Sequence, residues 1–142
     1  MKALIDTCVV IDVLCRREPF CIDGEKIFLA IAAHRTEGYL SAKEITDMYY
    51  LAHRHTHSDA ETRGILQTLL DLFHILDTTA ADCRTALDSD TSDFEDAVMM
   101  ASAQRSRMDC IVTRNIRDYT GSTIPVYTPE AFLAALESSE EL

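Results

Sequence analysis

The chain has 142 residues, of which 47% are hydrophobic and 26% are charged. This is ordinary globular usage, which excludes disorder along the whole chain, and the length suits one domain with its own core. The 24 acidic residues outnumber the 13 lysines and arginines, so the formal net charge is −11. That charge excludes a non-specific DNA-binding protein that relies on a basic surface.

The cysteines and the lengths of the apolar runs indicate the cellular compartment of the protein. The five cysteines form no CxxC pair, and their odd number suits free thiols in a reducing environment. Asp6 and Asp12 interrupt any signal-peptide core at the N-terminus, and no apolar run approaches the roughly 20 residues of a membrane span. We therefore expect a cytoplasmic protein with no membrane segment.

The first half of the chain alternates short apolar runs with amphipathic segments. Residues 2–5 predict a buried strand, and residues 39–40 predict a second one. Ser41 is followed three residues later by Glu44, a capping-box signature that predicts the start of a helix. The expected helices of this half cover residues 9–14, 22–34 and about 42–54.

The second half continues the alternation. Further capping-box signatures predict helix starts at Ser58 with Glu61, Thr79 with Asp82, and Ser92 with Glu95. Strands are expected at 73–76, 110–112 and 125–127. Thr128 followed by Pro129 predicts the start of the last helix. Residues 1–136 are expected to form one domain, and residues 137–142 a short acidic tail.

Short apolar strands that alternate with amphipathic helices indicate a parallel sheet with helices on both faces. The expected fold class is therefore α/β, a three-layer α/β/α sandwich around a central, mostly parallel sheet. In such sheets ligands bind beyond the carboxyl ends of the strands, so the residues just after each strand are the candidates for chemistry.

Four acidic residues stand at the ends of expected elements. Asp6 follows the first strand, and Glu44 lies one turn into the helix after the second. Asp96 lies in the first turn of the helix that leads into the fourth strand, and Asp118 follows that strand. Carboxylates crowded in one crevice repel each other unless a hard cation such as Mg²⁺ compensates them.

Each acid also has a local explanation. Asp6 suits a turn or helix cap, Glu44 suits the third position of its capping box, and Asp118 suits a loop. Asp93 and Asp96 complement a helix N-terminus electrostatically. For any one of these acids, the local explanation competes with the interpretation that the acids form a shared site. Their common placement at the ends of strands favours the shared site.

Two other groups of residues are discounted. His53, His55 and His57 straddle an expected helix end, where residues two apart do not share a face, so a surface cluster is favoured over a metal site. Cys8 lies near Asp6 but has no histidine partner in its motif, which argues against a cysteine nucleophile.

Four segments carry a resemblance to a known family: LIDTCVVIDVLCRREPF, LSAKEITDMYYLA, SDFEDAVMMASA and IVTRNIRDY, followed by IPVYTPEAFLAAL. In this order they resemble a PIN domain over nearly the whole chain. Within that family they are most similar to the VapC-type toxins of VapBC toxin–antitoxin pairs.

The resemblance implies RNA cleavage that depends on Mg²⁺ or Mn²⁺ and leaves 5′-phosphate and 3′-hydroxyl ends. It assigns the metal and catalytic roles to Asp6, Glu44, Asp96 and Asp118. Asp93 and Thr113 are implied as supporting residues. Asn115 stands where many PIN domains have an aspartate, so in this TRNxxD pattern either Asn115 or Asp118 completes the site.

The resemblance also implies partners. PIN toxins commonly form homodimers and are inhibited by a small antitoxin, and an antitoxin arginine in the acidic crevice would pair with the carboxylates. Arg16, Lys43 and Arg114 flank the motifs and are candidates for contact with RNA phosphates, as are Arg17 and Arg117. For each cation, a solvated surface position is the competing interpretation.

Two alternatives to the nuclease were weighed. A phosphotransfer enzyme also places an aspartate after its first strand, but Cys8 stands where a haloacid-dehalogenase-type enzyme needs a second aspartate. A receiver domain would require a lysine after a late strand, but the sequence has no lysine after Lys43. The remaining alternative is a non-catalytic PIN module that binds RNA or a partner protein.

Overall fold

The computed structural model describes residues 1–141, and within them one parallel sheet has the strand order β3-β2-β1-β4-β5. The strands are β1 (Lys2–Ile5), β2 (Glu37–Ser41), β3 (His74–Leu76), β4 (Cys110–Val112) and β5 (Val126–Tyr127). The order reverses beside β1, because the chain builds outward to β3 and then returns to place β4 on the other side. A crevice at such a reversal is the usual ligand position in open parallel sheets.

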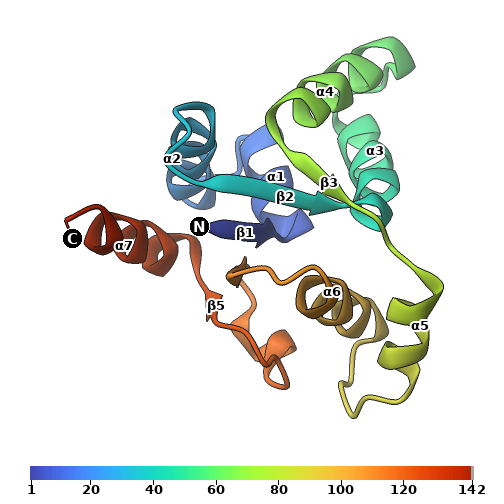
Figure 1. The fold of residues 1–142 in the computed structure, drawn as a ribbon. Coiled ribbons are helices and arrows are strands. Elements are labelled where there is room, and N and C mark those ends of the chain that lie inside the picture. Colours follow the sequence, from blue (N-terminus) through green and yellow to red (C-terminus); the bar gives the residue numbers. More distant parts are fainter. Residues whose placement is uncertain (142) are drawn as a thin grey trace.

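Helices cover both faces of the sheet (Figure 1). They are α1 (Thr7–Leu14), α2 (Phe20–Ala32), α3 (Ala42–Thr56), α4 (Asp59–Leu72), α5 (Ala80–Leu87), α6 (Phe94–Arg105) and α7 (Pro129–Glu140), with a short 3₁₀ helix, η1 (Ile116–Tyr119). The predicted three-layer α/β/α class with a parallel sheet is confirmed.

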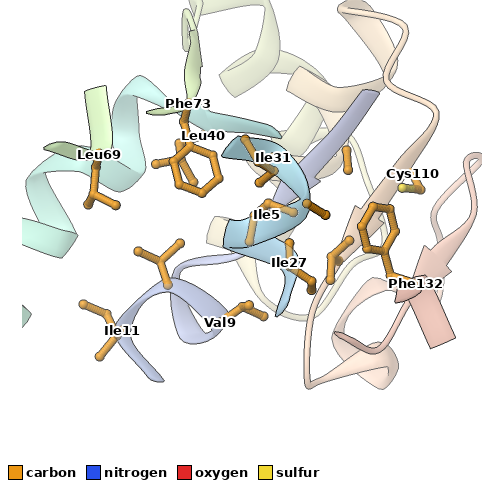
Figure 2. Close-up of a cluster of buried hydrophobic side chains, with 14 of the residues drawn as sticks. Ile5, Val9, Ile11, Ile27, Ile31, Leu40, Leu69, Phe73, Cys110 and Phe132 are labelled. Carbon is orange, nitrogen blue, oxygen red and sulfur yellow. The ribbon is translucent and has the colours of Figure 1, made fainter. Parts of the chain in front are cut away.

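Two cores lie on opposite faces because successive strand residues point to opposite sides. Ala3 and Ile5 of β1 belong to the larger core, under α1, α2, α3, α4 and α7. Figure 2 shows side chains of this core, among them Ile5 of β1, Val9 and Ile11 of α1, and Phe132 of α7. Leu4 points the other way, into a smaller core with α6 and η1.

The predicted helix starts are largely confirmed. Capping boxes form at the starts of α3 and α5, Ser58 accepts a hydrogen bond from the backbone of Glu61, and Thr128 caps α7 with Pro129 in its first turn. The predicted start at Ser92 with Glu95 is wrong by one residue. Asp93 caps α6 by accepting from the backbone N of Asp96 at 3.1 Å, and Glu95 instead pairs with Lys43.

The end of the chain is helical as far as Glu140, which Arg35 binds through two hydrogen bonds of 2.8 and 2.9 Å. The division of the chain at residue 136 stays a prediction, and Leu142, the end of the expected tail, lies outside the described residues. Among the residues described, no helix combines the length and apolar character needed to cross a membrane.

Candidate active site

A cavity of about 370 Å³ lies beyond the carboxyl ends of β1 and β2, lined by residues of α3 and α6. In Figure 1 the heads of these two strands point toward the space between the two helices. Asp6, Glu44 and Asp96, three of the four acids singled out in the sequence, line this cavity. Three stretches far apart in the chain thus place carboxylates around one space.

Asp6 is held at the junction of β1 and β4. Its backbone N–H donates to the carbonyl of Val112 at 2.9 Å, which continues the pairing of the two strands. The fully buried Thr113 donates its hydroxyl to Asp6 Oδ2 at 2.8 Å. The same hydroxyl accepts from the backbone N of Asn115 at 3.0 Å. Thr113 therefore links the Asp6 carboxylate to the start of the segment that leads into η1.

Glu44 is both a capping residue and a wall of the cavity. Its Oε1 accepts from the backbone N of Ser41 at 2.8 Å, and its Oε2 accepts from the Thr7 hydroxyl at 3.0 Å. The side chain is only 2% exposed. Burial, with the nearby negative charge of Asp6, raises the pKa of Glu44 to about 8, although both hydrogen bonds oppose the rise. The local and the functional interpretations of this residue are compatible.

Asp96 lies in the first turn of α6 and is partly buried. Burial raises the pKa of Asp96 to about 6, and the negative charges of Asp93, Asp6 and Asp118 add to the rise. Within residues 1–141 no lysine or arginine forms an ion pair with Asp6, Glu44 or Asp96. The negative charge of Asp6 thus adds to the raised pKa of both Glu44 and Asp96, as expected for a site that lacks a compensating cation.

Asp118 and Asn115 lie apart from this cavity. Both side chains are exposed, and Asp118 lines a neighbouring depression of about 470 Å³ together with Arg117. Asp118 is still near enough to raise the pKa of Asp96. The structure therefore brings three of the four predicted acids to one cavity and leaves the fourth at its side.

The donor set fits a hard divalent cation, although the ligands are not assembled. Carboxylate oxygens are the ligands that Mg²⁺ and Mn²⁺ prefer, and here three carboxylates face one space. Yet in the described part of the chain no three His, Cys, Asp or Glu side chains converge tightly enough to hold a metal. Hydrogen bonds from Ser41 and Thr7 occupy both oxygens of Glu44.

The basic candidates differ in what they contact. Lys43 lines the cavity and pairs with Asp47 and with Glu95 across it. Arg114 donates to the buried Asp12 at 2.5 and 3.2 Å and lies 4.1 Å above the ring of Phe20.

Two more of the basic candidates lie near the end of α1. Arg16 is exposed and has a positive φ of 49°. Arg17 lies 4.0 Å from Asp12. Of the basic candidates, Lys43 is the one that lines the acidic cavity.

Several side chains at the site received no role from the sequence, among them Arg54, which lines the cavity, and Tyr119 and Cys8. Tyr119 directly follows Asp118, but η1 turns it inward, so that it is 2% exposed. Cys8 lies two residues after Asp6 and directs its thiol at Asp6 Oδ2, 3.6 Å away. Burial and the charge of Asp6 raise the pKa of Cys8 to about 11, which agrees with the prediction that it is not a nucleophile. Adjacency to the acids was the only signal for Tyr119 or Cys8.

Comparison with known proteins gives a consistent result. A family model described as PIN domain matches residues 2–117. No curated protein is significantly similar in sequence. A toxin–antitoxin complex from Klebsiella pneumoniae is 24% identical, with a TM-score of 0.65 over 89% of this chain and 97% of that one.

Two further solved structures share the fold. DNA-bound VapBC from Salmonella typhimurium is 15% identical, with a TM-score of 0.65 over 91% of this chain and 98% of that one. VapC20 from Mycobacterium tuberculosis, described as a toxin that cleaves the sarcin–ricin loop, is 14% identical, with a TM-score of 0.60 over 77% of this chain and 86% of that one. At these identities the likeness is one of fold.

Proposed function

The chain belongs to the PIN domain family, and on that basis we propose that it is an endoribonuclease that hydrolyses RNA phosphodiester bonds with the help of Mg²⁺ or Mn²⁺. The observation that carries the proposal is the cavity beyond β1 and β2, where Asp6, Glu44 and Asp96 come together. Among the described residues these acids have no paired cation, so a divalent ion would relieve their repulsion.

Asp6, Glu44 and Asp96 would hold the ion, and Asp118 would act on it through water from the side of the cavity. When bound, such an ion supplies Lewis-acid polarisation of the scissile phosphate. The chain's own part is to hold the carboxylates. Thr113 orients Asp6, and the capping box of α3 orients Glu44.

Asp93 and Asn115 would support this site from their helix starts. Asp93 caps α6 and so fixes the turn that carries Asp96. Asn115 donates its backbone N–H to Thr113, which holds Asp6.

Of the cations singled out in the sequence, Lys43 is the best placed to meet an RNA phosphate beside the scissile bond, because it lines the cavity. Its pairing with Asp47 and Glu95 would hold its ammonium group at the cavity when RNA is absent. Arg16 would add an exposed contact. Arg114 is engaged by Asp12 and Phe20, so its role as a phosphate contact would require it to leave a buried partner.

The most specific form of the proposal is the toxin of a toxin–antitoxin pair, acting as a homodimer in the cytoplasm. The toxin–antitoxin complexes of similar fold support a small antitoxin as the partner. The acidic cavity supports the means of inhibition, since an antitoxin arginine would find carboxylates with which to form charge-assisted hydrogen bonds. Occupation by that arginine would exclude a divalent ion from the same carboxylates.

A non-catalytic PIN module that binds RNA or a partner protein remains the second candidate. One observation favours it: within residues 1–141 no ready group of metal ligands exists, and both oxygens of Glu44 already accept hydrogen bonds. In that case the protein would bind RNA without Mg²⁺ or Mn²⁺ and without cutting it.

Cleavage assays on antitoxin-free protein separate the two candidates. We expect the wild type to cut RNA with Mg²⁺ or Mn²⁺ and to stop in EDTA, whereas Asp96→Asn stays inactive in every condition. Asp71→Asn is the matched control, because Asp71 is an exposed acid of α4 that accepts a hydrogen bond from Gln67 and does not line the cavity. RNA binding by the wild type without cleavage, together with no heat of Mn²⁺ binding by calorimetry, would favour the non-catalytic module.

A further inference from the structure

The hydroxyl of Tyr119 is a buried polar atom without a partner. Tyr119 ends η1, and its side chain is 2% exposed. Throughout residues 1–141, its Oη is the one buried side-chain nitrogen or oxygen that makes no hydrogen bond. Buried hydroxyls nearly always find a partner, because an unpaired one loses its bonds to water and gains none in return.

Packing does not explain why this residue is a tyrosine. The ring lies in the smaller core with Leu4, Met99 and Ile111, all of them apolar. A phenylalanine would fill the same space and would bury no hydroxyl. The unpaired hydroxyl therefore lowers the stability of the fold in this structure. Its presence indicates that it finds a hydrogen-bond partner in another state of the protein.

The surroundings of the hydroxyl identify that partner. The ring packs in the same core as Met99 of α6, and Met99 lines the acidic cavity together with Asp96, which lies one turn earlier on the same helix. The hydroxyl lies near enough to the Asp96 carboxylate to oppose the rise in its pKa as a donor, although the two groups do not meet at hydrogen-bond distance in this structure. The unpaired donor thus lies beside carboxylates that a divalent ion would draw together.

We propose that Tyr119 is a positioning residue of the acidic site, whose hydroxyl donates a hydrogen bond to the Asp96 carboxylate when the site holds its divalent ion. This inference rests on the proposed function. A donor on one carboxylate oxygen directs the other oxygen toward the ion, which is the role that partners behind metal ligands commonly have. The position of Tyr119 on η1 then explains why the chain turns this residue inward and the adjacent Asp118 outward.

The test compares Tyr119→Phe with wild type by two readouts that do not depend on cleavage. Calorimetry with Mn²⁺ should show binding weaker by about tenfold or more, the usual effect of losing such a partner. Thermal unfolding without metal should show a melting temperature equal to or above that of the wild type, because an unpaired buried hydroxyl has been removed. Tyr39→Phe, in the same core, is the matched control and should alter neither readout.

The outcomes separate this inference from the proposed function. Equal Mn²⁺ affinity in wild type and Tyr119→Phe would overturn the inference alone. A clearly lower melting temperature of the metal-free variant would also overturn it, because the hydroxyl would then be bonded in the resting fold. No Mn²⁺ binding by the wild type would overturn the proposed function together with the inference.

Discussion

Glu44 and Asp82 occupy the same local position in two helices but differ in their electrostatic state. Each is the third residue of its helix and completes a capping box, with Ser41 in α3 and with Thr79 in α5. Each side chain is 2% exposed. Yet the pKa of Glu44 is raised to about 8, whereas that of Asp82 is lowered to about 2.

The difference arises from residues distant in the sequence. Burial alone would raise the pKa of Asp82, but Arg105 donates to its two oxygens at 2.8 and 3.1 Å and Ser102 adds a bond of 2.9 Å. Glu44 receives only neutral donors and lies near the negative charge of Asp6. A buried acid paired with a cation contributes to the fold, whereas one that lacks a cation and faces other acids is available to a ligand.

The largest expected effect is on cleavage by Glu44→Gln. Losing a direct ligand should lower RNA cleavage by at least about 100-fold, above the usual effect of losing an outer partner. The amide keeps the length of the side chain and can still serve the capping box. Thermal unfolding should therefore show no loss of stability in the same variant. Cleavage at the wild-type rate would remove Glu44 from the site.

Asp82→Asn should produce the reverse result. The substitution removes the carboxylate charge that pairs with Arg105. Because Arg105 is partly exposed, its guanidinium can regain hydrogen bonds to water, which limits the loss of stability. We expect a loss of about 2 kcal/mol in the free energy of unfolding at neutral pH, from a pKa shift of roughly two units. Urea unfolding would measure it. Cleavage per folded molecule should equal that of the wild type, and a specific loss of cleavage would contradict the comparison.

The same pair makes a prediction for acid. The folded-state pKa of Asp82, about 2, lies below its ordinary value of 3.8. Its stabilisation is thus fully present above pH 3.8 and is lost as the pH falls through 2. The difference in unfolding free energy between wild type and Asp82→Asn should be constant from pH 7 to 5 and should shrink toward zero near pH 2. A constant difference down to pH 2 would show that the lowered pKa is not the cause.

The smallest effect is expected from Asp118→Asn. This carboxylate is exposed and lies in the depression beside the cavity, so it acts on Asp96 only from a distance. Cleavage should fall by less than about tenfold, equivalent to under about 1.4 kcal/mol in the activation free energy. A loss as large as that of Glu44→Gln would make Asp118 a direct ligand in the active state.

Much of the fold and part of the site were predictable because they depend on local patterns. Capping signatures located the starts of α3, α4 and α5, and the acids after the strands pointed to one edge of the sheet. The start of α6 was predicted one residue early because Ser92 and Glu95 have capping-box spacing, whereas Asp93 is the residue that caps the helix. With Asp93 as the cap, Glu95 pairs with Lys43 of α3, a residue on another helix.

By itself, the sequence determined the strands, most of the helix caps, the three-layer class and the resemblance to the family, because apolar period and capping depend on residues within one turn or strand of each other. The tertiary structure alone decided which buried acid has a cation and which does not. It also turned Tyr119 inward and Asp118 outward, and it bound Arg114 to Asp12. Burial and charge compensation are settled between residues brought together by the crossings of the chain, so no local pattern contains them.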